Sequence, residues 1–459
     1  MANDKDKRHN VKQIDFSAKS LGKIKRGQQK PRNDIDESMP KKKQAGKIKS
    51  QINSKRSTDA PAKPAKARAA ESRRNDGYGG IGKDALSVVE GGRSFKRMLP
   101  KAVIGALCAI IVLSGVIFCA TRPTGIGEWL KTTFTSGENA HGYPVGFGDS
   151  ISDSMYVANG RLYILRESDI RCYDASGGTL FSRVLGFSNV AMRTSAMRTL
   201  TFDRGGTQYR IDSVADEIVS KSSDNKLIDC DIADNGNYAL GTLSENEAGT
   251  VTVYNNRNEE IYKFHSADSQ ILHVVISRDG KNIGVCSVSI ENSQAVSTVS
   301  MYSVNSEKAV RVEKLAGQTV YAMRFANNGK ICVITDKNWI AISKDDVKKI
   351  GFESKSPMKY QFTDNGNTLI SLAGASNSAE NNIIVLKPNG ERAAEFKVNS
   401  TVDSVCADSN KIYVLSSTLD VYSYEGEKLG SNEIEPGAKC VRAAFGKAAV
   451  LYSAGVEVY

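Results

Sequence analysis

Between residues 154 and 452 the chain repeats one unit: an alternating apolar strand, a tight turn and a second apolar strand. DCDIADNGNYAL and YAMRFANNGKICVI are typical copies, with Asn-Gly between the two apolar segments. A tight hairpin turn needs positive φ angles, which Gly and Asn tolerate, so this pattern is a strong hairpin signal. The turn centres recur about every 41 residues, at Gly160, Ser195, Gly236, Gly280, Gly329, Gly366, Asn410 and Gly446.

A second turn follows in most units, at Gly177-Gly178, Asn256, Asn305, Asp345-Asp346, Asn389-Gly390 and Glu425-Gly426. Two hairpins per period give four strands per unit, which is the composition of a β-propeller blade. We therefore predict an all-β fold, a β-propeller of eight blades; a count of seven stays open because the second unit, VAMRTSAMRTLTF, is irregular. We assign a structural turn role to Gly160, Gly206, Gly236, Gly280, Gly329, Gly366 and Gly446.

The last unit stops at its third strand, Val456–Tyr459, and an unpaired candidate strand, Tyr143–Phe147, precedes the first unit. We predict that Tyr143–Phe147 completes the last blade, because such a closure removes an exposed sheet edge and joins the ends of the ring.

The string Asp203-Arg204-Gly205-Gly206 is the most distinctive local sequence of the repeat region. We interpret it as a hairpin turn between the second and third strands of its blade, with glycine supplying a positive φ. An Asp/Arg pair presented at a propeller face is the functional alternative.

Before the repeats, Ala102 to Ala120 reads AVIGALCAIIVLSGVIFCA and carries no charge. At about 1.5 Å per residue, a helix of this length crosses the roughly 30 Å hydrocarbon core of a bilayer. A cleaved signal peptide fits less well, because no A-x-A site follows. The membrane-proximal basic residues are Arg93, Lys96, Arg97 and Lys101. Since basic residues beside a span stay cytoplasmic, we predict a single-pass cell-membrane protein with its N-terminus inside and its C-terminal domain extracytoplasmic.

The net charge of +11 is unevenly distributed. Residues 1–101 hold 27 Lys/Arg and 11 Asp/Glu, a net of +16, and the remaining residues have a net charge of −5. The first 92 residues have few large apolar side chains, which is typical of a disordered chain. We expect this arm to tether the protein or to bind anionic inner-leaflet lipids, at about 1 kcal/mol per basic residue near the surface. Nucleic acid ranks last, because no aromatic residues alternate with the lysines.

These features predict four parts of the chain: a disordered basic cytoplasmic arm (1–92), a juxtamembrane and transmembrane segment (93–121, core 102–120), a stalk containing Trp129 (122–142) and an extracytoplasmic β-propeller (143–459).

Eight cysteines are spread along the chain, two in the apolar run and six in the repeat region. An even number of cysteines in an exported domain is compatible with disulfide bonds. Most of the six, however, lie in apolar strand-like segments of a domain large enough to build a core without them. We favour buried free thiols.

No catalytic, cofactor or metal motif is evident. There is no C-x-x-C, no Cys/His group with zinc spacing and no G-x-S-x-G elbow. Asp364–Thr368 matches only part of a sialidase Asp-box, which is a structural turn in any case. With two tryptophans, Trp129 and Trp339, the chain does not fit a quinone-cofactor propeller. We expect His265 and His273 to be satisfied or exposed rather than metal ligands, and we predict no catalytic, cofactor-binding or metal residues.

Four segments carry a family resemblance: YPVGF at 143–147, LFSRVLGFSN at 180–189, TFDRGG at 201–206 and ISRDGKNIGV at 276–285. On these the chain resembles a family of single-pass membrane proteins from Gram-positive bacteria with an extracytoplasmic WD40/TolB-like β-propeller domain of unknown function. The resemblance implies a basic tail, one anchor and an exported propeller, and it implies no established activity.

The predicted function is a membrane-anchored, non-enzymatic binding or scaffolding module for an unknown protein or cell-wall polymer. An exported hydrolase or lyase and a sensor coupled to the basic tail are the alternatives. An enzyme is expected to show charged groups with perturbed pKa values converging at one mouth of the channel, and a binding module a broad shallow face.

Overall fold

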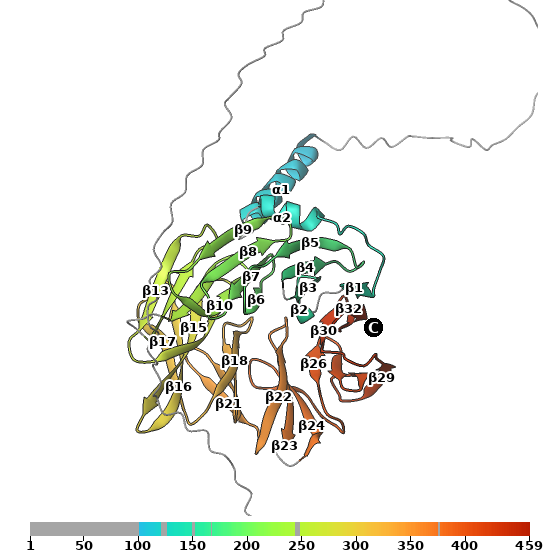
Figure 1. Ribbon diagram of the computed structural model, residues 1–459. Coiled ribbons are helices and arrows are strands. Elements are labelled where there is room, and N and C mark those ends of the chain that lie inside the picture. The colour runs from blue at the N-terminus through green and yellow to red at the C-terminus, as the bar shows by residue number, and fades with distance from the viewer. Residues whose placement is uncertain (1–100, 121–125, 149–151, 167, 244–247, 375–376) are drawn as a thin grey trace, which may run out of the picture. The chain divides into compact units, whose positions relative to one another are not determined.

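The computed structural model describes residues 101–120, 126–148, 152–166, 168–243, 248–374 and 377–459 (Figure 1). The predicted disordered arm and the basic residues Arg93, Lys96 and Arg97 lie outside the described residues. Lys101 is the first residue of helix α1 (Lys101–Ala120), which coincides with the apolar run.

The large side chains in the middle of α1 are exposed, among them Leu107, Ile110, Ile111, Val112 and Leu113. Within the described residues, no helix has the combined length and hydropathy that a membrane crossing requires.

Eight four-stranded antiparallel sheets form the blades of a β-propeller (Figure 1). In seven blades the strands follow chain order, so each strand pairs with its sequence neighbour. The strands of blades 1 to 4 are β2 (Ser152–Ala158), β3 (Arg161–Arg166), β4 (Asp169–Tyr173), β5 (Thr179–Val184), β6 (Val190–Thr194), β7 (Arg198–Asp203), β8 (Gln208–Ser213), β9 (Glu217–Ser222), β10 (Lys226–Ile232), β11 (Tyr238–Leu243), β12 (Gly249–Tyr254), β13 (Glu260–Ser266), β14 (Gln270–Ile276), β15 (Asn282–Glu291), β16 (Gln294–Ser303) and β17 (Ala309–Ala316).

The strands of blades 5 to 8 are β18 (Val320–Phe325), β19 (Ile331–Thr335), β20 (Asn338–Ile342), β21 (Val347–Gly351), β22 (Lys355–Phe362), β23 (Thr368–Gly374), β24 (Asn377–Leu386), β25 (Arg392–Val398), β26 (Ser404–Ala407), β27 (Ile412–Leu415), β28 (Thr418–Tyr422), β29 (Lys428–Glu433), β30 (Cys440–Ala444), β31 (Lys447–Leu451), β32 (Gly455–Val458) and β1 (Val145–Gly146).

The eighth blade joins the two ends of the repeat region. Its strand order is β1-β32-β31-β30, with Val145 opposite Val456. The Phe147 N–H extends the pairing by donating to the Ala454 carbonyl at 2.7 Å. The predicted closure by Tyr143–Phe147 and the count of eight blades are thus confirmed.

Most of the predicted turn glycines lie in the left-handed region of φ, where a side chain is strained. The positive φ values belong to Gly160, Gly236, Gly280, Gly329, Gly366 and Gly446. Gly206 differs: the left-handed residue of its turn is Gly205, with φ 84°. Gly206 instead closes the turn, because its N–H donates to the Asp203 carbonyl at 3.0 Å.

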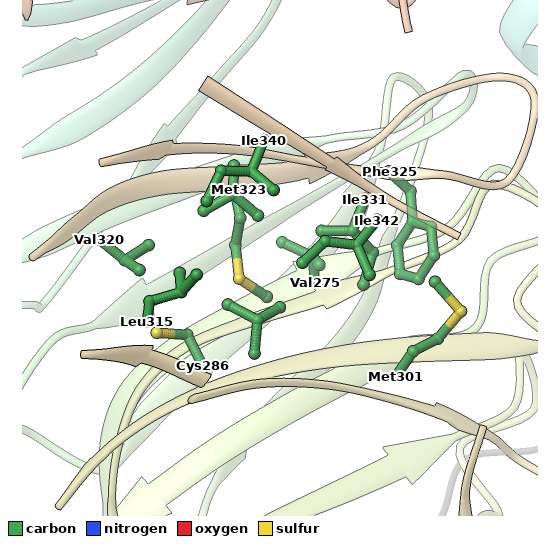
Figure 2. Close-up of a cluster of buried hydrophobic side chains, with 12 residues drawn as sticks. Val275, Cys286, Met301, Leu315, Val320, Met323, Phe325, Ile331, Ile340 and Ile342 are labelled. Atoms are coloured by element: carbon green, nitrogen blue, oxygen red, sulfur yellow. The ribbon is translucent and has the colours of Figure 1, made fainter. Parts of the chain in front are cut away.

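Buried apolar side chains fill the spaces between neighbouring blades. Figure 2 shows one such cluster, in which Val275 and Cys286 of blade 4 meet Met323, Ile331 and other residues of blade 5. Neighbouring blades therefore bury apolar side chains against each other, which is the stabilising principle of repeat folds.

The six cysteines of the repeat region are free thiols; five are buried and Cys440 is half-buried. Burial raises the pKa of Cys172, Cys286 and Cys332 to about 12.

The predicted stalk, 122–142, contains a second helix, α2 (Ile126–Phe134).

Candidate functional site

The first strands of six blades line a cavity of about 480 Å³ with residues of β2, β6, β10, β14, β18 and β22, and turns add Arg204, Asp234 and Arg278. Successive side chains of a strand point to opposite faces, so alternate residues of these strands reach the cavity. A cavity of this size, with converging polar groups, is the default candidate for a binding site in a fold of this kind.

Asp229 joins three neighbouring blades at the cavity wall. Arg193 Nη2 lies 2.7 Å from its Oδ1, and His273 Nδ1 lies 3.4 Å from its Oδ2. The Val274 N–H also donates to Oδ2, at 3.3 Å. Burial alone raises the pKa of Asp229, but Arg193, His273 and the backbone N–H outweigh it and hold the pKa below its ordinary value. Both oxygens are therefore engaged, and the carboxylate acts as a structural anion.

Asp231 is two residues further along β10 and lines the same cavity. Its Oδ2 accepts the Ile276 N–H at 2.9 Å, and among the described residues it makes no ion pair within 4.0 Å. Burial raises its pKa to about 6, against the opposing fields of Arg193 and Arg324. A carboxyl with this pKa in a cavity is an indicator of a functional site.

Two arginines of the lining have no carboxylate closer than 4.0 Å among the described residues. Arg324 donates from Nη1 to the Phe362 carbonyl at 3.2 Å. Arg204 keeps 49% of its side chain exposed, and its Nη2 is 4.0 Å from Asp229 Oδ1. Arg278, by contrast, lies 3.2 Å from Asp234.

Tyr321 and Tyr360 add two exposed aromatic side chains to the lining. The Tyr360 hydroxyl donates to the Tyr321 carbonyl at 3.4 Å. The arrangement therefore combines planar guanidinium donors, which match carboxylate and phosphate oxygens, with aromatic faces.

The structure places the sequence-predicted residues as follows. Asp203 and Arg204 do form a β7–β8 turn, as predicted, but they do not pair with each other. Asp203 Oδ1 accepts the Asn189 N–H at 2.8 Å, whereas the Arg204 side chain lines the cavity. His273 has Asp229 as its partner, and His265 Nδ1 contacts Thr250 Oγ1 at 3.3 Å.

Asp229, Asp231, Arg193 and Arg324 carry most of the charge of the cavity and were not singled out from the sequence. The signal for Asp229 and Asp231 is present in the string DCDI, where two carboxylates alternate in an otherwise apolar strand. Within the described residues, no group of three His, Cys, Asp or Glu side chains is placed to hold a metal ion.

Comparison with solved structures shows the fold. The C-terminal WD40 domain of Sif2 is 10% identical, with a TM-score of 0.50, and the match covers 69% of this chain and 99% of that one. KlHsv2 with loop 6CD replaced by a Gly-Ser linker is 13% identical, with a TM-score of 0.39, over 51% of this chain and 80% of that one. At such identities the Sif2 likeness shows a propeller and nothing of its function.

Sequence comparison gives the family. No curated protein matches the chain. The model of a family of unknown function, DUF5711, matches residues 132–456, which is most of the propeller together with the end of α2. The anchor and the bacterial source implied by the resemblance above stay predictions. The chain belongs to the DUF5711 family.

Proposed function

We propose that this chain is a single-pass membrane protein whose extracytoplasmic propeller binds a partner through the channel cavity. The support for the anchor is the uncharged run Ala102–Ala120 and the basic residues before it. Exposed apolar side chains from Leu107 to Leu113 add to it, because a helix that is apolar on every face needs an apolar surrounding.

The partner presents an anionic group, a carboxylate or a phosphate, to the cavity. The observation that carries this proposal is the pair Arg204 and Arg324, two cavity cations without a close carboxylate among the described residues. Arg193 and Arg278 already engage Asp229 and Asp234. Asp231 is then the one remaining carboxylate of the described lining against Arg204 and Arg324, so it offsets their charge only in part. Guanidinium groups bind such oxygens bidentately.

A protein is the partner that a propeller favours, since its rigid ring displays loops suited to recognition. An anionic cell-wall polymer is the other source of the same chemistry. On the cytoplasmic side, the +16 segment 1–101 is proposed to contact anionic inner-leaflet lipids.

Catalysis is the second candidate function, and Asp231 is the observation that favours it. A carboxyl with a pKa of about 6 suits a general acid or base near neutral pH. We rank binding first because an acid–base pair would need a second free carboxyl beside Asp231. The nearest one along β10, Asp229, is already engaged by Arg193 and His273.

Added cysteines test the topology, with the unsubstituted chain and its eight native cysteines as the labelling background. Asp345, exposed in the β20–β21 turn, and Ser17, in the arm, are each replaced by cysteine. On intact wall-free cells a membrane-impermeant maleimide is expected to label the D345C protein at once and the S17C protein only after lysis. The reverse labelling order contradicts the proposed orientation, and equal labelling before lysis contradicts the anchor.

Photo-crosslinking tests the cavity. Benzoylphenylalanine in place of Tyr321 is expected to capture a partner on cells, whereas the same group in place of Asp345 is not. Arg324→Gln and Arg204→Gln should each lower the yield, and Arg392→Gln, at an exposed ion pair on β25, should leave it unchanged. Equal yields at both positions, or insensitivity to both arginines, contradicts the proposal. Mass analysis of the adduct separates a protein from a wall polymer.

A further inference from the structure

Helix α2 contacts the propeller through the side chains of Glu128 and Lys131 and through the backbone of Thr132. The Glu128 carboxylate accepts hydrogen bonds from Nε and Nη2 of Arg198, at 2.8 and 2.7 Å, and both side chains are largely buried. The Thr132 carbonyl accepts from Arg161 Nη2 at 2.8 Å, and the Thr132 side chain is buried. Lys131 adds an exposed ion pair with Asp216 at 2.9 Å. α2 is thereby held against the first two blades.

The opposite face of α2 is apolar. At about 100° per residue, Leu130 and Phe134 lie roughly 200° from the face that carries Glu128 and Thr132. They are 42% and 76% exposed. A helix on the surface of a globular domain normally buries its apolar stripe and exposes its polar one. Apart from the half-buried Trp129, α2 reverses this order, so Leu130 and Phe134 point away from the domain to which the helix is bound.

We propose that Leu130 and Phe134 insert into the outer leaflet of the bilayer, so that α2 lies in the membrane interface and holds the propeller at a fixed orientation. This inference rests on the proposed anchor. It would make α2 a second membrane contact, distinct from the span itself, and would limit the orientations that the propeller takes relative to the bilayer.

Chain length supports the bilayer as the occupant of this face. Five residues, 121–125, separate Ala120 at the end of α1 from Ile126 at the start of α2. Six Cα steps of at most about 3.6 Å keep the start of α2 within about 22 Å of the end of the span. Interfacial helices bury their apolar face about 5–10 Å into the headgroup and acyl boundary, which is well within that reach.

The flanking charge also fits an interface. Lys131 lies between the two apolar residues in sequence and keeps 62% of its side chain exposed. Its ion-pair partner Asp216 is also more than half exposed, so water screens this pair, unlike the buried pair of Arg198 and Glu128. Lys131 therefore remains a basic residue beside an apolar stripe, as in helices that lie on anionic lipid surfaces.

Fluorescence quenching of the full chain in nanodiscs of phosphatidylcholine and phosphatidylglycerol tests the inference. Phe134→Trp is made in a Trp129→Phe background, which leaves Trp339, a fully buried residue, as the constant signal. Lipids brominated near the headgroup are expected to quench the added tryptophan. Leu429→Trp, at an exposed apolar position on β29 of blade 7, is the matched control and is expected to stay unquenched.

The outcomes separate the two proposals. Failure of the chain to enter nanodiscs overturns the anchor. Entry without quenching of the Phe134→Trp signal overturns the role of α2 and leaves the anchor standing. Cross-linking between the Phe134→Cys residues of two copies in one nanodisc also overturns the role of α2, since its apolar face then forms a dimer contact. Leu130→Gln combined with Phe134→Gln should make α2 more accessible to hydrogen exchange without changing nanodisc entry.

Discussion

Replacing Asp229 with asparagine removes the anion that joins blades 2, 3 and 4 while keeping an oxygen for the Val274 N–H. Removing one partner of a buried ion pair costs about 3–5 kcal/mol, because the other charge stays buried and uncompensated. Asp229 is 4% exposed, but Arg193 keeps 32% of its side chain in contact with solvent. Water therefore screens part of the loss, and we expect a cost of about 2–3 kcal/mol.

The assay is urea unfolding of the full chain in detergent, with the cost taken as the shift in midpoint multiplied by the slope. Asp234→Asn is the matched control. Asp234 also bridges blades 3 and 4, by pairing with Arg278, but these side chains are 30% and 44% exposed. Exposed pairs contribute about 0–1 kcal/mol, so this variant should unfold close to the wild type.

The pH dependence gives the prediction a second readout. Because the pKa of Asp229 is held below its ordinary value in the folded state, its stabilising contribution is present above the unfolded pKa and is lost as pH falls through the folded one. The difference in the free energy of unfolding between the wild type and Asp229→Asn should therefore become smaller in acid. Equal midpoints for the Asp229 and Asp234 variants, or a gap that widens in acid, would refute the reasoning. So would a loss from Asp229→Asn that is fully additive with that from Arg193→Gln.

Three further predictions concern other parts of the propeller. Burial raises the pKa of Asp231 to about 6, so the cost of ionising it grows as pH rises from about 4 to 6. Asp231→Asn should therefore stabilise the chain at pH 7, by at most about 3 kcal/mol, and leave its urea midpoint unchanged at pH 4. The repeat-region cysteines should all react with maleimide in denaturant without reductant, and slowly in the native state; protection in denaturant would indicate disulfides. A Cβ on Gly455 would lie 2.8 Å from the Val145 carbonyl oxygen. Gly455→Val should thus detach β1 and speed hydrogen exchange over 143–147; unchanged exchange would contradict this closure.

The sequence predicted the blades because their turns are local. Asn-Gly and Asp-Gly specify a positive φ within four residues, and no tertiary contact is needed to recognise them. The irregular second unit shows the limit of that rule. Its first turn has no glycine at the centre; Ser195 closes it instead, with its N–H and Oγ both donating to the Arg198 carbonyl at 2.9 and 3.0 Å.

The cavity could not be predicted from the sequence, because its contacts join residues of neighbouring blades that are far apart in the chain. Arg193 and Asp229 are separated by 36 positions, and Asp229 and Val274 by 45. The turn-to-turn distance varies from 35 to 49 residues, so the repeat alone does not say which residues of neighbouring strands stand side by side. A shift of one residue sends a side chain to the opposite face of its strand. The carboxylates of DCDI were visible in the sequence, but their partners were not.

Strand β7 connects the end of blade 2 that binds α2 with the end that carries Arg204 of the cavity. Arg198, which binds α2, is its first residue, and Arg204, which lines the cavity, directly follows its last. Six residues at about 3.3 Å each place these two arginines roughly 20 Å apart, at opposite ends of the blade. If α2 lies on the bilayer, the end of blade 2 that carries Arg198 faces the lipid and the end that carries Arg204 faces away. Arg198 is already neutralised by Glu128, so anionic lipid does not compete for it, whereas Arg204 stays available to an anionic ligand arriving from the opposite side.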